Sequence, residues 1–148
     1  MRTCSRALAW FALLAAGAVP GAAEAASCSV TVTPVSFGTY QPLSTTPRDS
    51  TGRVTLDCNR NLTATVSLNA GVHGSGFTAR QMSNGSSRLG YQLYTNASHS
   101  IVWGDGTGGT LPVLMLDGAS HTIYGRVPAQ QMVSAGSYSD TILVTLSF

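Results

Sequence analysis

The feature that most constrains this fold is the stretch formed by residues 141–148 (TILVTLSF). Its side chains alternate with a period of two, which is typical of a β-strand with one buried face. One face of this predicted strand carries four apolar residues: Ile142, Val144, Leu146 and Phe148. The stretch has no charged residue and no proline, with which natural edge strands are usually blunted. It therefore predicts an open sheet edge that a strand from another chain completes, with this apolar face turned to the core or to the open groove.

The N-terminus has the features of a secretory signal peptide. Arg2 and Arg6 precede an apolar segment, residues 8–19, that is too short to span a bilayer as a helix. Small residues at positions 23 and 25 then favour cleavage between Ala25 and Ala26. The sequence therefore predicts a signal peptide over residues 1–25 and an exported domain over residues 26–148. The alternatives are a buried N-terminal helix and a lipoprotein anchored through Cys28, although no leucine stands at the usual place before that cysteine.

Export leaves two of the three cysteines, Cys28 and Cys58, in the mature chain. In an oxidising compartment such a pair most simply forms a disulfide. A loop of about 30 residues closed in this way contributes roughly 3–4 kcal/mol to stability in the chain-entropy model. A metal site is the alternative, but no histidine lies near either cysteine in the sequence.

The composition is that of one turn-rich β domain. The full chain of 148 residues has only 9% charged residues and 16 glycines, and 43% apolar residues are enough for a core. Every basic residue is an arginine, and these arginines are scattered rather than clustered. Nucleic-acid binding therefore has little support.

Short alternating stretches separated by turns recur along the mature chain. The clearest lie at residues 29–33, 53–58, 62–69, 89–93, 121–127 and 141–148. Asn84-Gly85 is a strong hairpin turn signal, and the glycine-rich segment 104–109 predicts a loop. No window of 11 residues after the predicted signal peptide has helical periodicity. The pattern predicts an all-β sandwich of about six strands, one fewer than an immunoglobulin-like domain of seven.

Residues that could carry catalysis are few and dispersed. The three histidines, His73, His99 and His121, are the only candidate bases, and neither a G-x-S-x-G nor an H-E-x-x-H motif is present. The loop that starts at Asp105 is a weak candidate for calcium or phosphate, because it has no repeated acidic pattern and no helix after it. We therefore predict no catalytic, metal or cofactor site and no small-molecule substrate. A secreted hydrolase or a sugar-binding module is the less favoured alternative.

Several strings in the mature chain, in this order, match one protein family. They are CSVTV (28–32), VSFGTY (35–40), RVTLDC (53–58), YQLY (91–94), VWGDGT (102–107), YGRVP (124–128) and AGSYSDT (135–141). The chain thus resembles the spore coat protein U domain family, which is shared with subunits of archaic, Csu-type chaperone–usher pili. The resemblance covers residues 28–148, nearly all of the predicted mature chain.

The resemblance implies an incomplete immunoglobulin-like sandwich of six strands, completed by a donor strand from another chain. It implies a structural, non-enzymatic subunit whose partners are a periplasmic pilus chaperone, an outer-membrane usher and other pilus subunits. It also implies that Cys28 and Cys58 form the disulfide of the family. Localisation would be periplasmic during assembly and then on the cell surface, as a pilus or secreted. A spore-coat or matrix protein outside any pilus is the alternative.

One departure from the family concerns the donor segment. Polymerising subunits of the family carry it ahead of the first cysteine, whereas the predicted cleavage leaves only Ala26 and Ser27 before Cys28. Two residues cannot fill a groove of strand length, which is about five or six residues. We therefore expect a subunit that accepts a strand and gives none, at one end of a fibre and plausibly at its tip.

Overall fold

The computed structural model describes residues 24–148, which form eight β-strands and no helix. The strands are β1 (Cys28–Thr33), β2 (Arg48–Cys58), β3 (Thr63–Leu68), β4 (Arg80–Asn84), β5 (Ser87–Tyr94), β6 (Val113–Leu116), β7 (Ser120–Val127) and β8 (Val144–Ser147). No helix in the described part of the chain is long and apolar enough to cross a membrane. Residues 1–23 of the predicted signal peptide lie outside the described residues.

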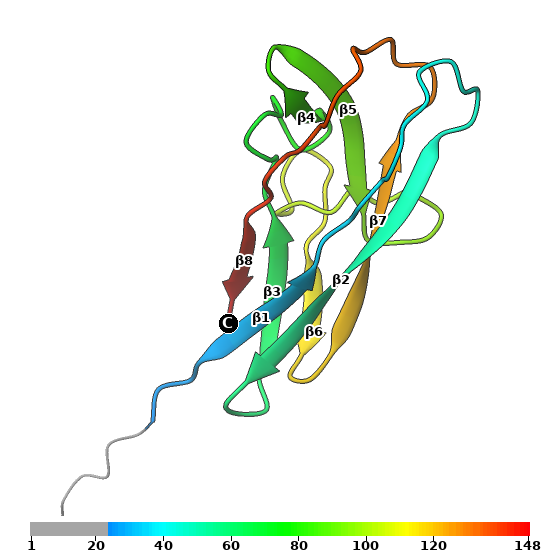
Figure 1. Ribbon diagram of the computed structural model, residues 1–148. Helices are drawn as coiled ribbons and strands as arrows, with labels where there is room; N and C mark the ends of the chain where they lie inside the picture. The colour runs from blue at the N-terminus through cyan, green and yellow to red at the C-terminus, as the bar shows by residue number, and fades with distance from the viewer. Residues whose placement is uncertain (1–23) are drawn as a thin grey trace, which may run out of the picture.

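The strands form two sheets that pack face to face (Figure 1). A five-stranded sheet has the order β1-β2-β7-β5-β4, and a three-stranded sheet has the order β6-β3-β8. All of these pairs are antiparallel. The predicted all-β sandwich is confirmed, although eight strands replace the expected six or so. The difference comes from short strands such as β4 (RQMSN), which has no clear apolar alternation.

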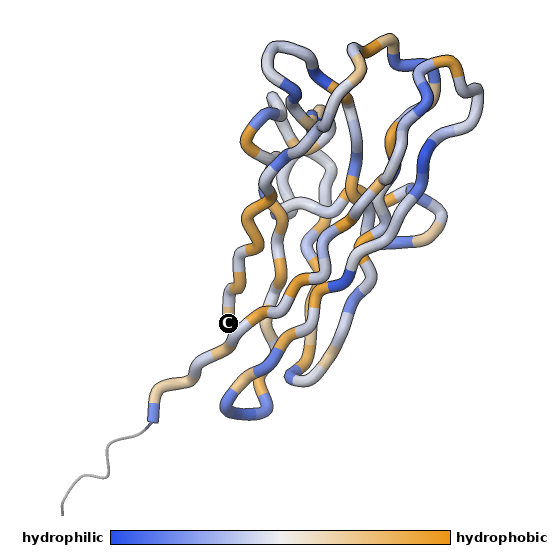
Figure 2. The backbone as a smooth tube through the Cα atoms, in the orientation of Figure 1, coloured by the Kyte–Doolittle hydropathy of each residue, from blue (hydrophilic) through white to orange (hydrophobic). Residues whose placement is uncertain are grey.

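The core lies between the two sheets and is built from the inward positions of alternating strands. Val54 and Leu56 of β2 and Val66 and Leu68 of β3 are all buried, and hydrophobic residues recur along both strands in Figure 2. Trp103 is fully buried at the centre, where its indole Nε1 donates a hydrogen bond to the carbonyl oxygen of Val66 (2.9 Å). This bond satisfies the polar end of the indole, whose ring also packs edge-on against the ring of His121 (5.1 Å between centroids).

After β1 the chain leaves the sheet edge and crosses toward β7. A proline follows β1 directly, and it has no N–H with which to continue a ladder. Side chains hold the next residues instead: Ser50 Oγ donates to the Ser36 carbonyl (2.6 Å), and Arg48 Nε donates to the Phe37 carbonyl (2.7 Å). Phe37 packs over Gly125, where a Cβ would lie 2.8 Å from the phenyl ring. The missing side chain at Gly125 therefore lets Phe37 reach the core.

Candidate strand-acceptor groove

A groove of about 890 Å³ lies between the two sheet edges that β1 and β8 form. Its first side, here called wall one, lies within residues 32–42 and comprises the end of β1 and the segment that crosses toward β7. Its second side, wall two, lies within residues 133–144 and leads into β8. In Figure 1 wall one is the blue-to-cyan stretch after β1, and wall two is the red stretch before β8.

At every second residue of β8, the backbone N–H and C=O groups point toward the groove. β8 pairs only with β3 among the described residues, in the register Val66–Leu146. Asn69 N donates to the Leu143 carbonyl (3.1 Å), so the polar groups of Leu143 and of every second residue after it point to β3. The N–H and C=O groups of Val144 and Leu146 therefore point to the free edge, and an added strand could pair with them.

The same alternation applies to β1, which pairs only with β2 within residues 24–148. Asn59 N donates to the Ser27 carbonyl (3.0 Å), which sets the phase of this ladder. Val30 and Val32 therefore direct their backbone polar groups away from β2. Two strand edges, one from each sheet, thus border the same opening.

The floor of the groove is the hydrophobic core itself. Its buried apolar members are Phe37, Leu68, Met82, Leu89, Tyr91, Leu93 and Ile123. These residues come from both sheets, so the sandwich is open along this line rather than sealed by a strand. An occupant with apolar residues at every second position would cover the floor and remove its surface from water.

The four predicted groove residues differ in how close they lie to the groove. Ile142 and Val144 line the groove and are half-buried. Leu146 packs against the core beyond the lined part, opposite Val66. Phe148 follows the end of β8 and is 62% exposed. The regular strand is also shorter than predicted, with four residues in place of eight.

The predicted disulfide and the predicted cleavage site both involve the start of β1 or the residues just before it. Cys28 and Cys58 are joined by a disulfide and face each other directly in the β1–β2 register. The disulfide fixes the edge strand β1 to its neighbour. Ala25 and Ala26 are exposed, and the Ala25 carbonyl accepts a hydrogen bond from Asn59 Nδ2 (3.1 Å). Cleavage between these two alanines stays a prediction.

Side chains that the sequence did not single out attach wall two to the rest of the fold. The Asp140 carboxylate accepts hydrogen bonds from Tyr91 Oη (2.6 Å), Val72 N (2.9 Å) and His73 N (3.3 Å). Tyr138 Oη donates to Ser87 Oγ (2.6 Å) at the start of β5. The upper part of wall two is therefore held by β5, by the loop after β3, and by a single backbone bridge in which Ser139 and Ser83 of β4 exchange two hydrogen bonds (2.8 and 3.1 Å).

A buried guanidinium supports the same region. The Arg80 side chain is 1% exposed, and within residues 24–148 no carboxylate forms an ion pair with it. It donates instead to neutral acceptors: the Asn69 carbonyl (2.7 and 3.0 Å), Gln92 Oε1 (2.6 Å) and the Trp103 carbonyl (2.7 Å). Burial lowers the pKa of Arg80, but the charge stays because an arginine pKa starts so high. Arg80 thus ties together the end of β3, β5 and the Trp103 segment.

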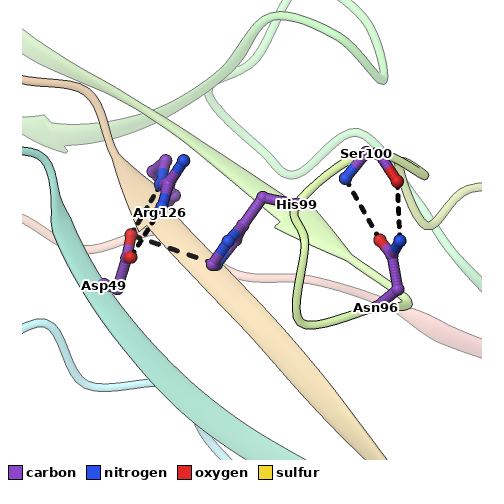
Figure 3. A network of polar contacts seen from close by, with 5 residues as sticks. All are labelled: Asp49, Asn96, His99, Ser100 and Arg126. Atoms are coloured by element: carbon purple, nitrogen blue, oxygen red, sulfur yellow. Dashed lines mark hydrogen bonds and ion pairs between the residues drawn. The ribbon is translucent and has the colours of Figure 1, made fainter.

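The histidines do not form a hydrolytic site in the described chain. His99 Nε2 lies 3.9 Å from Asp49 Oδ1, but both oxygens of that carboxylate accept hydrogen bonds from Arg126 at 2.7 Å (Figure 3). This Arg126 hydrogen bond lowers the pKa of Asp49. Within residues 24–148, no serine or threonine hydroxyl hydrogen-bonds to a histidine ring; the Ser100 hydroxyl accepts from Asn96 instead (Figure 3). The contact between His99 and Asp49 therefore lacks a nucleophile.

No cluster of metal ligands is present in the described part either. No group of three or more His, Cys, Asp or Glu side chains gathers there in a way that could hold an ion. The Asp105 carboxylate accepts from Thr107 N (2.9 Å) and from the Thr107 hydroxyl (2.6 Å), and this hydroxyl bond lowers the pKa of Asp105. The glycine loop is therefore closed on itself as an Asx turn.

Comparison with known proteins gives a family-model match over residues 12–145, to the family described as the Spore Coat Protein U domain. Protein U of Myxococcus xanthus is 35% identical over an alignment of 127 residues, which covers 77% of this chain and 71% of that protein. The family-model match includes β1 and wall two and ends within β8.

Solved structures resemble the fold at lower identity. One is the crystal structure of the CsuC–CsuE chaperone–tip adhesion subunit pre-assembly complex from archaic chaperone–usher Csu pili of Acinetobacter baumannii, with a TM-score of 0.55 and 21% identity. The similarity covers 84% of this chain and 40% of the matched chain, so this chain spans less than half of it. The E. coli Hda pilus minor tip subunit, HdaB, matches at a TM-score of 0.43 and 18% identity, over 80% of this chain and 79% of that one. At 21% identity, the likeness to the chain of the Csu complex concerns the fold alone.

Proposed function

This chain belongs to the Spore Coat Protein U domain family, and from that premise we propose that it is an exported structural subunit of a chaperone–usher surface pilus. Its sandwich is completed by a strand that another chain inserts. The partners are a periplasmic chaperone before assembly, the outer-membrane usher, and a neighbouring subunit in the fibre. The role is structural and not catalytic.

The observation that carries the proposal is the groove of about 890 Å³ between two unpaired strand edges. Its floor is apolar core, and its edges offer backbone N–H and C=O groups at alternate residues such as Val144 and Leu146. These are the two requirements for strand addition, in which main-chain hydrogen bonds supply affinity and alternating pockets supply selection. The fold similarity to a chain of the Csu chaperone–subunit complex supports the same reading.

The direct test is co-purification of the tagged chain from the periplasm of its host, with partners identified by mass spectrometry. We expect a periplasmic chaperone in stoichiometric amount. Leu143 and Val144 provide a matched pair of variants, because Leu143 is 62% exposed and points away from the groove that Val144 lines. Leu143→Asp should still co-purify with the chaperone, whereas Val144→Asp should not be recovered as soluble protein. Recovery of the soluble wild-type chain without any chaperone would contradict the proposal.

We further propose that the subunit only accepts a strand and therefore occupies one end of a fibre, the distal tip. This proposal depends on cleavage between Ala25 and Ala26, because β1 already begins at Cys28. Sequencing the N-terminus of the mature protein tests the premise. Fibres that the purified chain forms alone would contradict the end position, since self-polymerisation needs a donor segment.

A second candidate is a secreted spore-coat or matrix protein outside any pilus. The similarity to Protein U of Myxococcus xanthus, at 35% identity, favours it. The same groove would then join copies or partners within a coat. Genes for a periplasmic chaperone and an outer-membrane usher beside the gene for this chain would favour the pilus, and their absence would favour the coat.

A further inference from the structure

We infer that Tyr40 closes one end of the groove and limits the length of the strand that the groove accepts; this inference rests on the proposed function as a strand acceptor. Tyr40 belongs to wall one, lines the groove and is half-buried. Its hydroxyl accepts a hydrogen bond from Gln131 N (2.8 Å) and donates one to the Pro128 carbonyl (2.9 Å). One tyrosine hydroxyl therefore connects wall one to the segment from which wall two begins.

The segment on the far side of this connection is itself fixed. The Gln131 side-chain amide bonds both backbone groups of one residue of β5: it accepts from Gly90 N (2.8 Å) and its Nε2 donates to the Gly90 carbonyl (2.8 Å). The amide thus docks on β5 as the backbone of a neighbouring strand would. Since Gln131 is held to β5 in this way, the bond to Tyr40 is anchored rather than loose.

A second bond joins the same two segments just outside the groove. Gln130 N donates to the Ser44 carbonyl (3.2 Å). Both connections lie at the end where the loop after wall one meets the start of wall two, at the top of the view in Figure 1. With two cross-connections at one end, a strand that runs between the walls stops there.

The other end of the groove is open. Within residues 24–148, β1 pairs only with β2 and β8 pairs only with β3, so no ladder joins Val32 to Val144. An inserted strand therefore enters beside β8 and advances toward Tyr40. From Val32 to Tyr40 wall one comprises about nine residues, or about 30 Å if fully extended, which fits a strand of about eight to ten residues.

The test uses the chain itself and needs no identified partner. A two-residue Asn-Gly turn after Phe148, followed by alternating valine and threonine, forms a hairpin with β8 and returns into the groove. Strands of eight, ten, twelve, fourteen, sixteen and eighteen residues make a length series. The melting temperature should rise by roughly 4 °C with each added pair of residues. It should stop rising at about thirteen residues, because about four residues run beside the end of β8 before the strand reaches Val144 and about nine more bring its tip to Tyr40.

Tyr40→Phe removes both hydroxyl bonds but keeps the ring that fills the groove wall. In this variant the melting temperature should continue to rise for one or two further pairs of residues. Gln131→Ala, which releases the segment from Gly90 and leaves Tyr40 in place, should have the same effect. The control is Tyr124→Phe, because Tyr124 lies on β7 and does not line the groove. The control should leave the limiting length unchanged.

The outcomes separate this inference from the proposed function. If no extension raises the melting temperature, the groove does not accept a strand and the proposed function is wrong. If extensions stabilise the wild type without a limiting length, or if Tyr40→Phe has the same limit as the wild type, strand acceptance stands and the role of Tyr40 is overturned.

Discussion

Replacing Asp140 with alanine should destabilise the native state by about 2–4 kcal/mol, because one carboxylate accepts hydrogen bonds from two separate parts of the fold. The bond from the Tyr91 hydroxyl, at 2.6 Å, is charge-assisted and contributes about 1.5–3 kcal/mol. Tyr91 is only 7% exposed, so water does not easily replace the lost acceptor. The bonds from Val72 N and His73 N contribute less, roughly 0.5–1 kcal/mol together, since Val72 lies in an exposed loop.

The assay is thermal and urea unfolding followed by circular dichroism, where this loss lowers the melting temperature by about 10–15 °C. A double-mutant cycle with Tyr91→Phe isolates the bond between the two side chains and should give a coupling energy of about 1.5–3 kcal/mol. Asp105→Ala is the control: its carboxylate also accepts two hydrogen bonds, but within an exposed turn, and the change should leave the melting temperature unchanged. A loss below 1 kcal/mol for Asp140→Ala would show that Asp140 does not anchor wall two.

Three further results follow from the structure. Val144→Asp should abolish recovery of soluble protein, since it places an unpaired charge beside the core, whereas Leu143→Asp should express normally. Replacing Cys28 and Cys58 together with serine should lower the free energy of unfolding by about 3–4 kcal/mol in chemical denaturation, because the disulfide closes a loop across 30 positions. Thiol alkylation followed by mass spectrometry should find no free thiol in the wild-type protein, and two free thiols there would contradict the disulfide. Burial, with a smaller contribution from the Asp140 hydrogen bond, raises the pKa of Tyr91 above its ordinary value near 10. The unfolded chain therefore releases this proton above pH 10 while the native state keeps it, so stability should fall by up to about 1.4 kcal/mol per pH unit above pH 10, and a Tyr91→Phe variant with the same slope would contradict the assignment.

Strict alternation made the main strands predictable from the sequence. β7 matches the predicted stretch 121–127 to within one residue, and β3 lies within the predicted stretch 62–69. The Asn84-Gly85 signal also holds, because Gly85 has a φ of 57° in the turn between β4 and β5. Such local signals depend only on neighbours in the chain, which is why a single sequence carries them.

The features that could not be predicted from the sequence depend on contacts between residues that are distant in the chain. β2 starts at Arg48 rather than at residue 53, because residues 48–55 pair with β7. β4 has a buried arginine in place of an apolar residue, so its inward face does not look apolar. Arg80 finds its acceptors at residues 69, 92 and 103, and no local pattern indicates them. The hydrogen-bond partners of Asp140, at residues 72, 73 and 91, are just as distant in the chain.

The groove is completed only late in the synthesis of the chain. Its walls come from residues 32–42 and 133–144, so nearly the whole domain separates them in the chain. A ribosome makes wall one early and wall two among the last segments of the domain. Until then the nascent chain has an edge strand and an apolar surface but no site in which a partner strand can be seated between two walls. Under the proposed function, assembly would thereby be restricted to finished subunits, and a polypeptide truncated anywhere before wall two would be excluded from the polymer without a separate mechanism of quality control.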